Sequence, residues 1–223
     1  MKKSLLLGLA AAIAAMSAVP ALAQVRITEV AAWGSGNAPY ASDWFELTNF
    51  GASAVSLSGW KMDDNSNSFA AAVAMTGIST IAAGESVIFL ESAVNSSFLN
   101  TWFSSAMPGL KIGNYTGSGV GLGTSGDAVN VYNSSGVLQA NVAFGTSPAG
   151  PTFATFNNAA GLNNTTISQL SVVGVNGAFK AANDQYEIGS PGSIAAPVPE
   201  PGTYALLLAG LGLVGAVARK RRI

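Results

Sequence analysis

Between residues 25 and 144, hydrophobic and polar positions alternate over short stretches that are separated by Gly, Asn and Ser. The stretch 25–30 shows this period of two, which is typical of a strand with one buried face. The stretch 85–91 is the most apolar, and 133–136 has the composition of a tight turn. The other predicted strands are 44–48, 55–57, 59–63, 128–132 and 137–144. In contrast, 96–103 is expected to form a short helix that ends before Pro108.

Many short strands joined by turns about every ten residues predict an all-β sandwich. Large inward-facing side chains fill such a fold, so Trp44 and Trp60 are expected to pack in or beside its core. Glu46 stands between apolar neighbours within the predicted strand 44–48. We expect it either to face solvent or to be a partly buried carboxylate that backbone donors or an ion hold.

The N-terminal residues have the pattern of a signal peptide. A basic start, Met1-Lys2-Lys3, is followed by an apolar run over 5–15. Ala21 and Ala23 then fit the small-x-small rule for signal peptidase, which predicts cleavage before Gln24. The sequence therefore predicts a signal peptide over 1–23 and an exported domain over 24–194.

The C-terminal residues form a second, three-part signal over 198–223. A short motif, Val198-Pro199-Glu200-Pro201, precedes an apolar run over 203–218, and Arg219-Lys220-Arg221-Arg222 follows it. As a helix, the apolar run would cover about 24 Å, slightly less than a typical hydrocarbon core, and local thinning of the bilayer absorbs such a mismatch. The four cations favour the cytoplasmic face and would stop transfer there. A buried helix of a soluble protein is the alternative, but it would rarely stand at a terminus with a basic cluster directly behind it.

This order of motif, apolar run and basic cluster resembles the PEP-CTERM sorting tail. The resemblance implies that an exosortase recognises the tail near Pro199-Glu200-Pro201 and processes it during export in Gram-negative bacteria. It also implies that the chain passes transiently through the inner membrane on its way to the cell surface or the extracellular matrix.

Charge and composition exclude several classes of function. Residues 24–197 hold four basic and ten acidic residues, a net charge of −6, whereas the whole chain carries −1. An acidic domain without a basic stripe argues against nucleic-acid binding. The chain has no His and no Cys, which excludes Ser-His-Asp and Cys-His catalysis, His-ligated zinc or iron, and disulfides. We therefore expect no catalytic residue and no resident cofactor.

Carboxylates are the remaining candidates for chemistry. Asp63, Asp64 and Asn65 form an oxygen-rich loop, and calcium takes six to eight oxygen ligands. The loop lacks the spacing of an EF-hand, so Asp63 and Asp64 are weak candidates for a calcium site. The other interpretation is a turn whose Asp and Asn side chains bind local backbone donors. A polysaccharide hydrolase would need two carboxylates about 5–10 Å apart in a cleft, and no motif in the sequence indicates such a pair.

The predicted domain resembles the lamin-tail domain, an immunoglobulin-like β-sandwich that also occurs in bacterial surface and secreted proteins. The resemblance is strongest over 25–144 and weaker up to Gly192. Its most specific part is Asp43-Trp44-Phe45-Glu46-Leu47-Thr48-Asn49, joined to Leu57-Ser58-Gly59-Trp60. The other matching segments are 27–30, 55–57, 63–64, 81–85, 126–129 and 189–192.

Together these features predict an exported, non-enzymatic envelope or matrix protein. The sandwich would serve as an adhesion or scaffolding module for a polysaccharide or surface-protein ligand, with a looser link to exopolysaccharide or biofilm organisation. Two alternatives stay open at this stage. One is a carboxylate-based polysaccharide hydrolase, which requires two convergent acids in a cleft. The other is a stably membrane-anchored periplasmic binding domain whose tail is never removed.

Overall fold

The computed structural model describes residues 25–105, 107, 109–193 and 210–211. The predicted signal peptide and almost all of the predicted sorting tail lie outside these residues. Among the described residues, no helix is long and apolar enough to cross a membrane.

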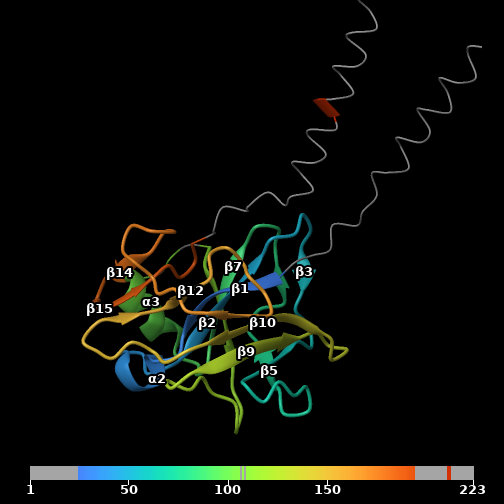
Figure 1. Cartoon of the computed structure of the whole chain (residues 1–223), viewed down its shortest axis with the longest axis horizontal. Coiled ribbons are helices and arrows are strands. Elements are labelled where there is room, and N and C mark those ends of the chain that lie inside the picture. Colours follow the sequence, from blue (N-terminus) through green and yellow to red (C-terminus); the bar gives the residue numbers. More distant parts are fainter. Residues whose placement is uncertain (1–24, 106, 108, 194–209, 212–223) are drawn as a thin grey trace, which may run out of the picture.

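The fold is a β-sandwich, as predicted (Figure 1). Its main sheet has the order β12-β1-β2-β7-β8-β5-β4-β9-β10-β13 among the described residues, and a smaller sheet has the order β11-β15-β14. The two helices of this region are α2 (Gly34–Asn37) and α3 (Asn95–Phe103). The strands are β1 (Val25–Ala31), β2 (Trp44–Asn49), β3 (Val55–Ser56), β4 (Lys61–Asp63), β5 (Val73–Thr76), β6 (Thr80–Ile81), β7 (Ser86–Leu90), β8 (Lys111–Tyr115), β9 (Asp127–Tyr132), β10 (Leu138–Phe144), β11 (Phe153–Ala154), β12 (Phe156–Asn157), β13 (Thr165–Ile167), β14 (Phe179–Ala181) and β15 (Asp184–Gly189).

Strand β5 joins the two halves of the main sheet. Its first residues pair with β4, at Val73 and Ala74, and its last residues pair with β8, at Met75 and Thr76. A strand shared in this way lets the sheet fold over, so that β1, β2 and β7 face β9 and β10. The side chains between the two halves form the main hydrophobic core, which includes Trp60.

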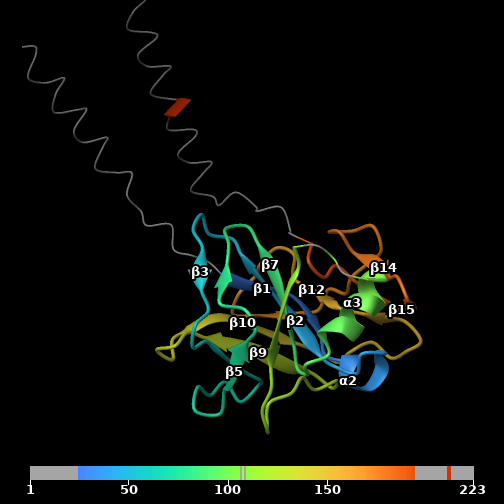
Figure 2. The ribbon, with the colours of Figure 1, turned by 180° about the vertical axis from the view of Figure 1, so that it is seen from behind.

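A second core lies on the outer face of β1, β2 and β7. It contains Trp33, Tyr40, Trp44, Phe98 and Trp102, and α3 together with the small sheet covers it. Figures 1 and 2 show α3, β14 and β15 together on one side of the molecule, away from β3 and β5. Both predicted tryptophan positions are confirmed, because Trp44 packs in this second core and Trp60 in the first.

The strands that the alternating pattern predicted are present as β1, β2, β3, β4, β7, β9 and β10, and the predicted helix is α3. The turn between β9 and β10 forms where expected, with Gly136 N donating to Asn133 O at 3.0 Å. Because β1, β2 and β7 are buried on both faces, their polar residues are enclosed as well. Two of these enclosed polar residues are glutamates.

Candidate functional site

Glu29 on β1 and Glu46 on β2 lie opposite each other in the sheet. A β-bulge between Ile27 and Glu29 shifts the register of β1 at this point. Both side chains are 1% exposed. Two carboxyl groups on adjacent strands, removed from water, are the most unusual chemical feature of the described chain.

The segment 189–192, which we call the clasp, covers this pair. Ser190 donates its backbone N–H to Glu29 Oε1 at 2.7 Å and its hydroxyl to Glu29 Oε2 at 3.0 Å. Gly192 donates its backbone N–H to Glu46 Oε2 at 2.7 Å, and the Thr155 hydroxyl also donates to Glu29 Oε1. The carboxyl groups therefore fasten the end of the domain onto its first two strands.

Burial dominates the electrostatics of the pair. It raises the pKa of Glu29 to about 7, although the hydrogen bonds from Thr155 and Ser190 oppose this shift. Burial raises the pKa of Glu46 well above its usual range, and the neighbouring charge of Glu29 raises it further. Two carboxylates placed this close do not both ionise near neutral pH, so the pair retains a proton there.

A row of hydroxyl groups leads from Glu46 toward the surface. Thr28 Oγ1 donates to Glu46 Oε1 at 2.5 Å and lies 2.9 Å from Thr48 Oγ1, which lies 2.6 Å from Ser86 Oγ. Because Thr28 donates to Glu46, it accepts from Thr48, which accepts in turn from Ser86. Ser86 lines a cleft of about 420 Å³ whose other wall residues are Ala82, Ala83, Gly84, Glu85, Met107, Gly109, Leu110 and Gly192.

This geometry bears directly on the hydrolase alternative. Glu29 and Glu46 converge, as a hydrolase would require, but they lie beneath the clasp and do not line the cleft. A second cleft of about 280 Å³, beside Asn157 and Gln169, has no acidic residue in its wall. The convergent acids therefore accept hydrogen bonds from the clasp and line neither of these two clefts.

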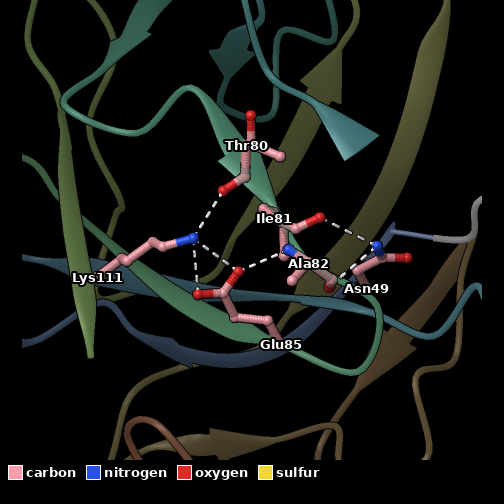
Figure 3. A network of polar contacts seen from close by, with 6 residues as sticks. All are labelled: Asn49, Thr80, Ile81, Ala82, Glu85 and Lys111. Carbon is pink, nitrogen blue, oxygen red and sulfur yellow. Dashed lines mark hydrogen bonds and ion pairs between the residues drawn. The ribbon is translucent and has the colours of Figure 1, made fainter. Parts of the chain in front are cut away.

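The acid that does line the first cleft, Glu85, takes part in a network on the turn 81–85 (Figure 3). Lys111 Nζ lies 2.8 Å from Glu85 Oε1 and donates to Thr80 O at 3.1 Å. Ala82 donates its backbone N–H to Glu85 Oε2 at 2.6 Å. Asn49 Nδ2 donates to the carbonyls of Ile81 and Ala82 at 3.2 and 3.1 Å. These contacts hold the cleft wall in place, and Lys111 neutralises the charge of Glu85.

A further buried acid, Glu187, lies in the second core. Tyr40 donates its hydroxyl to Glu187 Oε2 at 3.1 Å and accepts from Trp44 Nε1 at 3.0 Å and Trp102 Nε1 at 3.3 Å. Burial raises the pKa of Glu187 to about 8, and the charge of Asp184 adds to the shift. Burial and the charge of Glu187 raise the pKa of Tyr40 above its usual range. The tyrosine thus ties two tryptophans and an acid into one buried unit.

The calcium candidates occupy a turn with local partners. Asp63 Oδ2 accepts from Ser66 Oγ and Ser68 N, both at 2.6 Å, and Asp64 Oδ1 accepts from Ser66 N at 3.0 Å. This is the turn arrangement that the sequence offered as the alternative to a metal site. Within the described residues, no group of three or more His, Cys, Asp or Glu side chains is arranged to hold a metal ion.

Sequence reasoning missed Glu29, Glu187 and the role of the clasp. Of the two alternatives left open for Glu46, the structure shows the buried carboxylate, and Gly192 N is one of its donors. The signal that could have indicated the pair is a glutamate between apolar neighbours near the middle of β2, together with a second glutamate in β1.

Comparison with known families agrees with the architecture. The profile of the Lamin Tail Domain family matches residues 18–146, more than half of the chain. The chain belongs to the lamin tail domain family. The part of this lamin tail domain protein that follows the match contains β11–β15 and the clasp. A search of curated proteins found no match.

The profile of the PEP-CTERM protein-sorting motif matches residues 197–222. This lamin tail domain protein is therefore exported and sorted to the surface by an exosortase. The individual sorting residues predicted above lie outside the described residues: Ala21, Ala23 and Gln24 at the signal cleavage site, Val198, Pro199, Glu200 and Pro201 in the motif, and Arg219, Lys220, Arg221 and Arg222 in the basic cluster. The predicted spanning segment 203–218 also lies there, apart from Gly210 and Leu211.

Proposed function

We propose that this protein is a non-enzymatic adhesion or scaffolding module of the cell envelope or extracellular matrix. Signal peptidase removes 1–23, the segment 203–218 holds the chain in the inner membrane, and an exosortase processes it near Pro199-Glu200-Pro201. The sandwich then binds a polysaccharide or a surface protein through its loops or sheet faces, and contributes to exopolysaccharide or biofilm organisation.

The observation that supports a binding module most strongly is the burial of the convergent acids. A glycoside hydrolase exposes both of its carboxyl groups to the sugar. Here Glu29 and Glu46 are each 1% exposed and accept backbone hydrogen bonds from the clasp. The two acids therefore serve to fasten the clasp to the sheet, which is a structural role.

The test uses the natural host and two variants of the full chain. Glu46→Gln keeps the shape of the buried group, so we expect it to be exported and retained at the surface like the wild type. A chain that stops after Ser193 lacks the sorting motif, and we expect it in the periplasm instead. A wild-type protein that shortens host polysaccharide, with loss of this activity in Glu46→Gln, would contradict the proposal and favour the hydrolase.

A further inference from the structure

The loop between Ser171 and Ala178 carries three exposed valines. Val172, Val173 and Val175 are 60%, 50% and 45% exposed. Single exposed apolar residues are common on protein surfaces, but three within four positions form a patch. Figure 2 shows the orange loop that precedes β14 projecting from the body of the fold.

Backbone hydrogen bonds hold this loop in its shape. Val175 N donates to Val172 O at 2.9 Å, and Gly174 N donates to Ala178 O at 2.8 Å. Ser171 fastens the base of the loop, since its N–H donates to Thr155 O at 2.9 Å. These hydrogen bonds form an ordered turn that leaves the three valine side chains exposed.

The loop lies beside the point at which the chain leaves the domain. A Cβ built on Gly177 would stand 3.0 Å from both the Cβ and the Oγ of Ser193. Met107 is 36% exposed, and its sulfur lies 3.6 Å from the Cβ position of Gly192. The loop that carries the valines and the exposed Met107 thus both lie close to the last described residues of the domain.

The sequence beyond the exit limits how far the domain stands from a membrane. Nine residues, 194–202, separate Ser193 from the apolar segment 203–218. Fully extended, nine residues span at most about 30 Å. A domain tethered this closely meets the bilayer surface at a high effective concentration, so even a weak apolar contact is populated.

The loop itself carries no charge, which is compatible with a lipid surface as the partner. No charged residue stands between Asp127 and Lys180, although residues 24–197 as a whole are acidic. The valine loop therefore has no carboxylate that anionic headgroups would repel. The exposed Lys180 follows the loop on β14.

We propose that Val172, Val173 and Val175, with Met107, rest on the membrane surface while the C-terminal segment anchors the chain. The contact orients the domain and keeps the motif Pro199-Glu200-Pro201 at the bilayer, where a membrane-bound processing enzyme reaches it. This inference rests on the proposed function, since it requires the segment 203–218 to be inserted.

The absence of cysteine allows a direct test. Val173→Cys and Val137→Cys variants of the full chain each take an environment-sensitive fluorophore at one position. Val137 is a matched control, because it is 55% exposed and lies on the β9–β10 turn, on the opposite side of the molecule from β14 (Figures 1 and 2). Each labelled chain is reconstituted in vesicles of phosphatidylcholine and phosphatidylglycerol that contain a lipid-borne quencher.

Because interfacial segments sink about 5–10 Å into the headgroup region, we expect at least about twofold stronger quenching at position 173 than at 137. Adding Val172→Ser and Val175→Ser to the Val173→Cys chain should remove the difference. Equal quenching at both positions, in chains that float with the vesicles, would overturn this inference and leave the proposed function intact. Chains that do not float would refute membrane anchoring and the inference together.

Discussion

Replacing Glu29 by Gln should stabilise the domain at alkaline pH and leave it unchanged in acid. The folded state holds a proton on Glu29 up to about pH 7, whereas the ordinary pKa is 4.5. Between these values the folded state binds more protons than the unfolded state, so the free energy of unfolding falls as pH rises. The difference corresponds to roughly 3 kcal/mol lost between pH 4.5 and 7.

The glutamine side chain matches the neutral form of Glu29. Its carbonyl oxygen can accept from Ser190 N and Thr155 Oγ1, as Oε1 of Glu29 does. Its amide can donate to Ser190 Oγ, because a hydroxyl is able to accept as well as donate. We therefore expect Glu29→Gln to equal the wild type at pH 5 and to exceed it by about 1–3 kcal/mol at pH 8.

The assay is urea unfolding of a chain of residues 24–197, followed by tryptophan fluorescence at pH 5 and pH 8. Both hydrophobic cores lie within this range. Glu29→Ala is the contrasting variant, since it leaves Ser190 N without its acceptor and should destabilise the domain at both pH values. Burial also raises the pKa of Glu187 to about 8 and that of Asp43 to about 6, so wild-type stability should fall from pH 5 to pH 8. A wild type that gains stability over this interval, or a Glu29→Gln variant less stable than wild type at pH 8, would refute the reasoning.

Three further substitutions test other contacts by the same unfolding assay at pH 7. Gly189→Ala places a Cβ 2.7 Å from Glu29 Oε1 and should lower the free energy of unfolding by about 1–3 kcal/mol. Gly145→Ala is its control, because a Cβ there meets open space, and it should change stability by less than about 0.5 kcal/mol. Tyr40→Phe leaves the indole N–H groups of two tryptophans without an acceptor, so the free energy of unfolding should fall by roughly 2–5 kcal/mol. A fall of less than about 0.5 kcal/mol would show that these hydrogen bonds do not stabilise the second core. Asn49→Ala removes three hydrogen bonds to the carbonyls of Ser53, Ile81 and Ala82 and should cost about 1–3 kcal/mol, and an unchanged urea midpoint would show that the turn does not depend on it.

The alternating pattern predicted the longer strands of the main sheet, but not its strands β5, β8, β12 and β13 and not the small sheet. Strands β1, β2, β9 and β10 have six or seven residues each, enough to display a period of two. Strands β11 and β12 have two residues each and β14 has three, and so short a strand displays no period. Of the elements that cover the outer face of the sheet, only α3 was therefore predicted. Strand β15 has six residues, but an exposed Tyr186 beside a buried Glu187 breaks its alternation.

The buried pair Glu29 and Glu46 was also not predictable from local sequence. Local sequence around Glu46 indicated a carboxylate among apolar neighbours, and the structure places it there. The partners of Glu29, Thr155 and Ser190, are 126 and 161 residues away along the chain. Contacts of that separation depend on how the C-terminal layer folds back, which no local pattern encodes.

Processing of the sorting tail during export can be tested directly. The most direct measurement is the intact mass of the protein recovered from its own host, with cell-bound and medium fractions analysed separately. We expect a species that begins at Gln24 and ends near Pro199-Glu200-Pro201. A species that retains Arg219-Lys220-Arg221-Arg222 in both fractions would contradict processing and indicate a domain that stays anchored in the inner membrane.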